Sequence, residues 1–94
     1  MKMHAYIAGV GMTRFGKHLD VKLKHLAGEA IREALADSGI AAGEIQAAYM
    51  GNAAAGVLQG QEMIRGQVVL REMGIGRIPV VNVENACATS STAF

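Results

Sequence analysis

The most constraining feature of this sequence is a run of apolar side chains spaced as one face of an α-helix. They follow the i, i+3, i+4, i+7 spacing at Leu23, Leu26, Ala27, Ala30, Ile31, Ala34 and Leu35. Charged side chains fill most of the positions between them, so the pattern predicts an amphipathic helix with one face in a core. Asp20 is expected to cap the start of this helix, and Gly39 to end it in a left-handed conformation.

Short aliphatic segments on either side of this helix predict strands at His4–Val10, Ile45–Asn52 and Val80–Val83. A second helix is predicted over Glu62–Met73, although Gly66 within it costs about 0.8–1 kcal/mol relative to Ala unless close packing requires a missing side chain. The resulting order is β-α-β-α-β, followed by a polar run that resembles the start of another helix. This alternation predicts an α/β fold with a parallel sheet flanked by helices.

Composition and charge exclude several classes of protein. Nine Lys and Arg residues are interspersed with eight Asp and Glu residues, which argues against a nucleic-acid interface or a polybasic membrane anchor. A single cysteine cannot form an internal disulfide. No apolar run approaches the roughly 18 residues that suggest a membrane span, and the N-terminus does not resemble a signal peptide. A cytoplasmic location is therefore expected.

Two other binding chemistries find little support in the sequence. Gly9 and Gly11 suggest a dinucleotide fingerprint, but the next glycine, Gly16, comes too late for the G-x-G-x-x-G spacing. The three histidines have no cysteine or second histidine at ligand spacing, so no metal site is predicted.

The single cysteine, Cys87, follows the third predicted strand at the point where a helix is expected to begin. A helix N-terminus offers unpaired N–H groups and the positive end of a dipole, which favour a thiolate. A sharp strand-to-helix turn also exposes the nucleophile of other α/β enzymes. A lone cysteine is, however, more often a small buried apolar residue. Spacing alone therefore leaves both interpretations open.

Three segments resemble thiolases, and most closely the sterol-carrier-protein-X branch, also described as lipid-transfer-protein-like thiolases. They are AYIAGVGMTRFGK at residues 5–17, ALADSGI at residues 34–40 and VVNVENACATSSTAF at residues 80–94. The segments occur in the order of that branch and together extend over nearly the whole chain. The resemblance implies that residues 1–94 form the N-terminal portion of a thiolase N-terminal domain, without the rest of that domain or the C-terminal domain.

The resemblance also implies an acyltransferase reaction. Cys87 would take an acyl group from a 3-ketoacyl-CoA or acyl-CoA as a thioester, and a CoA thiol or an acetyl-CoA carbanion would then accept it. The Cys87 N–H is expected to be one donor of the oxyanion hole. Coenzyme A enters as a substrate thioester, and no bound cofactor is expected.

Several parts of the family's machinery match nothing in this chain. The activating His, the second Cys, the other oxyanion donor and most CoA contacts lie later in family members, so residues 1–94 are expected to be inactive alone. Ser90 stands where many thiolases have glycine, which leaves the substrate range open. Family members are dimers, which makes Val80–Val83 a candidate contact in a homodimer.

Two alternatives remain. One is a ketoacyl-synthase-type condensing enzyme, which also places a cysteine after such a strand. The other is a non-catalytic lipid-binding or assembly module on a thiolase scaffold. Alkylation of Cys87 by iodoacetamide at neutral pH, compared with a free cysteine peptide, would separate a scaffold from an enzyme.

Overall fold

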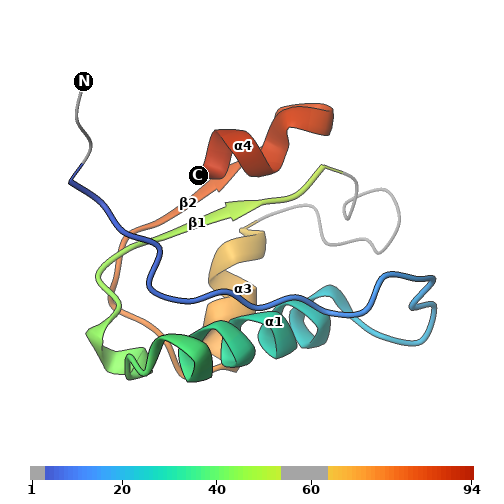
Figure 1. Cartoon of the computed structure of the whole chain (residues 1–94). Coiled ribbons are helices and arrows are strands. Elements are labelled where there is room, and N and C mark those ends of the chain that lie inside the picture. The colour runs from blue at the N-terminus through green and yellow to red at the C-terminus, as the bar shows by residue number, and fades with distance from the viewer. Residues whose placement is uncertain (1–3, 54–63) are drawn as a thin grey trace.

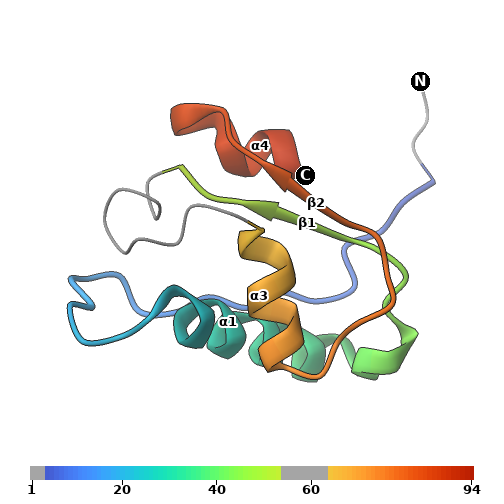
Figure 2. The ribbon, with the colours of Figure 1, turned by 180° about the vertical axis from the view of Figure 1, so that it is seen from behind.

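The computed structural model describes residues 4–53 and 64–94, and in them a two-stranded parallel sheet has helices on both faces (Figure 1). Helix α3 packs on one face of the sheet, with α1 packed against α3, and α4 packs on the other face (Figures 1 and 2). The elements are α1 (Leu23–Ser38), η1 (Ala42–Glu44), β1 (Ala48–Gly51), α3 (Arg65–Glu72), β2 (Val80–Val83), η2 (Ala86–Ala88) and α4 (Thr89–Ala93).

Strands β1 and β2 run parallel, with Ala48 opposite Val80 and Gly51 opposite Val83. Helix α3 lies between them in the chain, so the unit is the β-α-β arrangement that the alternating sequence pattern predicts. The α/β class is confirmed. Strand β2 has the predicted bounds. Strand β1 is shorter than the predicted Ile45–Asn52, because residues 45–47, which leave η1, and Asn52 lie outside it.

The first predicted strand, His4–Val10, is not formed in this structure. Its backbone lies against α1, where a Cβ atom on Gly9 would be 2.6 Å from the Ala34 carbonyl oxygen. The Val10 N–H donates a hydrogen bond to the Asp37 carboxylate at 3.0 Å. A strand exists only through pairing with a neighbouring strand. Gly9 and Val10 have a helix as their neighbour instead.

Helix α1 confirms the apolar periodicity and corrects one of its predicted ends. Gly39 ends the helix with φ of 71°, and its N–H donates to the Leu35 carbonyl at 3.0 Å. The prediction that Asp20 caps the start is wrong, because the N-cap residue is Lys22 and no side chain caps it. A capping side chain must come from the residue next to the first helical one, and Asp20 lies two residues too early.

Helix α3 shows why a glycine interrupts its predicted sequence pattern. A Cβ atom on Gly66 would lie 2.7 Å from Val80 Cγ1 and 2.9 Å from Met50 Cβ, so the helix touches both strands at this point. Val69 and Leu70, one turn later, are buried. The predicted start at Glu62 lies outside the described residues. The longest helix of the described residues, α1, has 16 residues, and none of the helices described there could span a membrane.

Candidate active site

Alternate residues of the strands point to opposite faces of the sheet. Helix α3 packs on one face, and α4, which follows Cys87, packs on the other. Val80, Asn82 and Met50 contact α3 at Gly66. On the opposite face, a Cβ atom on Gly51 would lie 2.8 Å from Thr89 Cγ2, so the end of β1 touches the first residue of α4. Cys87 lies between β2 and α4, within η2.

Cys87 is exposed. The structure places it four residues after the end of β2, in the short helical turn that continues directly into α4. The strand-to-helix position that the sequence predicts is therefore present, and in this structure the thiol is not a buried apolar filler.

Ala86, directly before Cys87, has a left-handed backbone with φ of 46°. An L-residue in this region costs roughly 1–2 kcal/mol, so the surrounding contacts must hold it there. The Ala86 N–H donates to Glu84 Oε2 at 2.5 Å. The Glu84 carboxylate therefore pairs with the backbone of this turn.

Thr89 holds the other side of the same turn. Its Oγ1 accepts a hydrogen bond from the Asn85 N–H at 2.8 Å and donates one to the Ala86 carbonyl at 2.7 Å. Thr89 is only 6% exposed, although it is polar. Two backbone groups on the N-terminal side of Cys87 are thus tied to one buried hydroxyl.

Sequence reasoning missed Thr89 because it stands within a run of small polar residues that indicates only a helix start. A threonine two positions after the cysteine was the available signal, but its burial depends on Gly51 of a distant strand. The side chain of Asn85 is also bound to α4, since its Nδ2 donates a hydrogen bond to Thr92 Oγ1 at 3.1 Å. Ser90, the position that departs from many thiolases, is exposed in α4.

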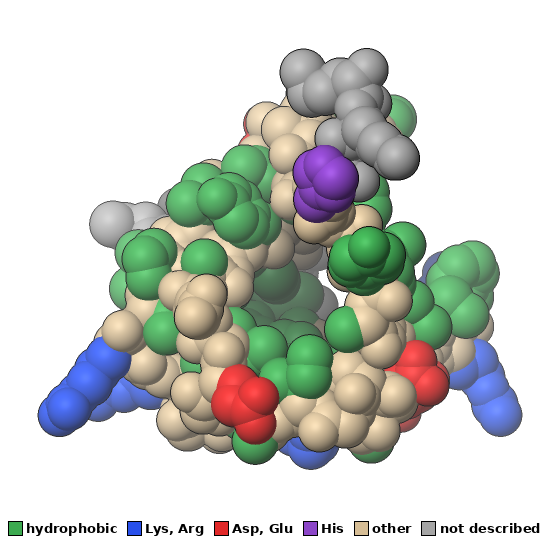
Figure 3. All heavy atoms as spheres, turned by 60° about the vertical axis from the view of Figure 1, so that its left-hand side comes forward, with side chains coloured by type: hydrophobic (Ala, Val, Ile, Leu, Met, Phe, Trp, Pro, Cys, Tyr) green, Lys and Arg blue, Asp and Glu red, His purple; other side chains and the backbone are tan. Residues whose placement is uncertain are grey.

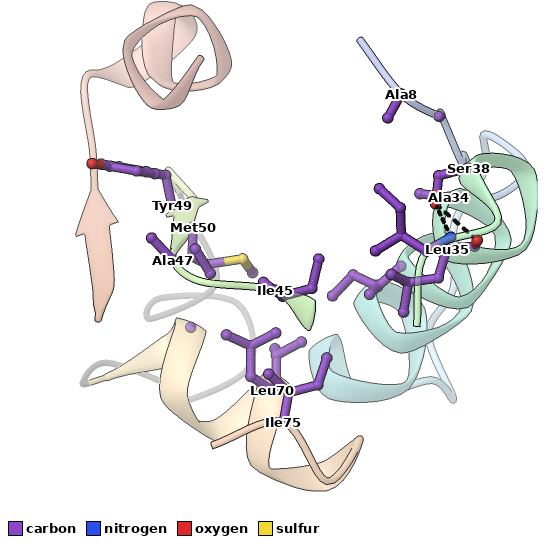
Figure 4. A pocket seen from close by; sticks show the side chains of 16 residues that line it. Ala8, Ala34, Leu35, Ser38, Ile45, Ala47, Tyr49, Met50, Leu70 and Ile75 are labelled. Atoms are coloured by element: carbon purple, nitrogen blue, oxygen red, sulfur yellow. Dashed lines mark hydrogen bonds between the residues drawn. The ribbon is translucent and has the colours of Figure 1, made fainter. Parts of the chain in front are cut away.

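A cavity of about 580 Å³ lies away from Cys87, lined by the N-terminal segment, α1, β1, α3 and the residues that link them. Its walls are mainly apolar, and a hollow lined by hydrophobic side chains is visible in Figure 3. Met50, Ile45 and Leu70 line it, while the Tyr49 ring points away (Figure 4). No residue of 84–94 lines this cavity, so it is not a pocket for the Cys87 thiol.

The histidine of helix α1, His25, does not lie near Cys87. His25 belongs to α1, which lies on the opposite side of the sheet from α4 (Figures 1 and 2). Among residues 4–53 and 64–94, no group of three or more His, Cys, Asp or Glu side chains is arranged to hold a metal ion.

Similarity to known proteins extends over nearly the whole sequence of this chain. The family described as "Thiolase, N-terminal domain" matches residues 5–94. Benzoylsuccinyl-CoA thiolase subunit BbsB of Thauera aromatica is 40% identical over 96 residues, which is 100% of this chain and 23% of that protein. Sterol carrier protein 2 of Gallus gallus is 36% identical over 96 residues, which is 100% of this chain and 17% of that protein.

An acetyl-CoA acetyltransferase of Methanothermobacter thermautotrophicus is 34% identical over 88 residues, which is 94% of this chain and 23% of that protein. The chain therefore spans less than a quarter of the length of these three relatives.

Proposed function

The chain belongs to the thiolase N-terminal domain family, and from this premise we propose that Cys87 accepts an acyl group from a coenzyme A thioester. The observation that carries the proposal is the exposed thiol on a held turn directly after β2. The relatives named as a thiolase and as an acetyl-CoA acetyltransferase support this chemistry.

The proposed step is an acyl exchange between two sulfur atoms. The Cys87 thiolate attacks the carbonyl carbon of the acyl-CoA, a new C–S bond forms, and the carbonyl oxygen becomes an oxyanion. The C–S bond to coenzyme A then breaks, and the CoA thiolate leaves and takes up a proton. Two smaller barriers replace one large barrier, which is the advantage of a covalent intermediate.

The Cys87 N–H is the proposed donor to the oxyanion. Hydrogen-bond donors fixed in place before the reaction stabilise this charge without reorganisation, and removing one costs about 10²–10³ in rate. The described residues bring no histidine of α1 to Cys87, so the proton acceptor and most of the CoA contacts are proposed to come from other parts of the protein. Residues 1–94 alone are proposed to be inactive.

We also propose that β2 contributes to a homodimer contact. Within the described residues, β2 pairs only with β1, so its other edge has no strand beside it. Val81, at the centre of the strand, is 43% exposed. An open edge with an exposed aliphatic side chain is suited to pairing with a second copy.

The test is the formation of a thioester on Cys87 in the complete gene product. Incubation with acetyl-CoA and a longer acyl-CoA, followed by intact mass measurement, should give an acyl adduct that hydroxylamine removes. Cys87→Ala should abolish the adduct, while the neighbouring exposed Ser91→Ala should retain it. Absence of any adduct on the folded wild-type protein would refute the proposal.

The same samples distinguish the alternatives. A condensing enzyme of the ketoacyl-synthase type would form the adduct but would accept a malonyl-derived carbanion rather than return the acyl group to free CoA. A non-catalytic scaffold would form no adduct, and iodoacetamide would alkylate Cys87 no faster than a free cysteine peptide.

A further inference from the structure

The peptide unit between Ala86 and Cys87 is held by hydrogen bonds, although Cys87 itself is exposed to solvent. We infer that Thr89 is a positioning residue for the proposed acyl transfer: its hydroxyl fixes the Ala86 carbonyl and thereby the direction of the Cys87 N–H. The inference rests on the proposed function of Cys87 and adds a specific residue to it.

The geometric link is the planarity of the peptide bond. The Ala86 carbonyl and the Cys87 N–H belong to one rigid plane and point in opposite directions. Thr89 Oγ1 donates to that carbonyl at 2.7 Å, and the Thr89 backbone N–H donates to the same oxygen. Two hydrogen bonds from one residue to this oxygen therefore set the orientation of the N–H on the other side of the plane.

The conformation of Ala86 shows that this orientation must be maintained. Its φ of 46° is unfavourable for a residue with a side chain, and both of its backbone polar groups are bound. Glu84 holds the N–H at 2.5 Å, and Thr89 holds the carbonyl. Without the hydroxyl of Thr89, Ala86 would relax toward an ordinary backbone conformation and rotate the Cys87 N–H with it.

The position of Thr89 is in turn determined by β1. Thr89 is 6% exposed, so water does not readily replace its hydroxyl. Gly51 allows the contact, because a Cβ atom there would be 2.8 Å from Thr89 Cγ2 and 3.2 Å from its carbonyl oxygen. The backbone and side chain of Thr89 thus pack on Gly51 of the strand, and the hydroxyl holds the turn.

The experiment compares two reactions of the same sulfur in the complete gene product. Acylation by acetyl-CoA passes through an oxyanion, whereas alkylation by iodoacetamide displaces iodide at a saturated carbon and forms none. Thr89→Val keeps the shape of the side chain and removes the hydroxyl. We expect acylation to slow about 10-fold to 100-fold, while alkylation stays within about twofold of wild type because it uses no oxyanion donor.

Two further variants complete the test. Thr89→Ser retains the hydroxyl and should acylate within about threefold of wild type, because the hydrogen bonds remain. Ser91→Ala removes a hydroxyl from an exposed residue of α4 and should change neither rate.

The possible outcomes separate this inference from the function on which it rests. No adduct on the wild type would refute the proposed function and the role of Thr89 together. An adduct that forms equally fast on wild type and Thr89→Val would refute the role of Thr89 alone, as would equal slowing of acylation and alkylation. If Thr89→Val fails to fold, Thr89→Ser decides, because slowing of more than about 10-fold despite a retained hydroxyl would overturn the inference.

Discussion

The two faces of the sheet are organised by different interactions. On the α3 face, Gly66 brings the helix into contact with both strands, and Val69 and Leu70 are buried beside it. On the α4 face, the one buried residue of α4 is Thr89, and Tyr49 remains 61% exposed. Apolar packing holds the first face, whereas hydrogen bonds around a strained turn hold the second.

This difference assigns separate roles to the two faces. Burial of apolar surface is non-directional and supplies most of the stability of a fold. Hydrogen bonds are directional and can hold one backbone orientation, although each adds only about 0.5–1.5 kcal/mol net. We therefore expect substitutions on the α3 face to change stability, and substitutions around Thr89 to change the rate at which Cys87 is acylated.

The largest effect on stability is expected from Leu70→Ala, which removes a buried side chain from α3. Such changes cost about 2–5 kcal/mol, and the lower part of that range is expected here because Leu70 already borders the cavity. Tyr49→Ala, on the opposite face, should cost about 1 kcal/mol or less. Urea denaturation followed by circular dichroism measures both. Equal losses would contradict the contrast between the faces.

A smaller loss is expected from Gly66→Ala. The added methyl group would meet Val80 and Met50 at less than 3 Å, so overpacking should outweigh the gain in helix propensity and cost about 1–3 kcal/mol. Gly43→Ala is the matched control, since its Cβ atom would meet nothing within 4 Å. A Gly66→Ala variant as stable as Gly43→Ala would show that α3 lies farther from the strands.

Asn82→Ala should cost about 1 kcal/mol, because Asn82 caps α3 from a strand. Its Oδ1 accepts the Gly66 N–H at 2.6 Å, and its Nδ2 donates to Gln67 at 2.7 Å. Asn82→Asp keeps the accepting oxygen and should retain most of the stability. Acylation of Cys87 by acetyl-CoA in the complete gene product should be unchanged in both variants. A change in its rate would show that the two faces are coupled through β2.

The smallest effect is expected from Lys24→Ala. Lys24 Nζ lies 3.6 Å from Glu72 Oε1 between α1 and α3, and the two side chains are 30% and 51% exposed. Exposed ion pairs contribute about 0–1 kcal/mol, so the free energy of unfolding should fall by about 0.5 kcal/mol or less. A loss comparable to that of Leu70→Ala would mean that charge rather than apolar packing joins these helices.

Local patterns in the sequence predicted much of this architecture. The apolar spacing of Leu23–Leu35 lies within the observed α1, and the aliphatic run Val80–Val83 coincides with β2. The position of Cys87 after that strand follows directly from chain order. Each of these features depends on neighbours within a few residues, which is the range over which side-chain periodicity carries information.

Other features depended on contacts between distant segments. Residues 4–10 have a strand-like composition, but they pair with neither β1 nor β2, and Gly9 and Val10 lie against α1. Gly66 looks like a weakness in a helix until Val80 and Met50 are seen beside it. Thr89 looks like one polar residue among many until Gly51 buries it.

The sequence by itself determined which segments become helices and strands and where the thiol stands between them, because backbone preference and apolar spacing act locally. Only the tertiary structure decided which side chains hold the turn around that thiol. A hydroxyl can hold a peptide plane only when another part of the chain excludes water from it, and here that part is Gly51, 38 positions before Thr89.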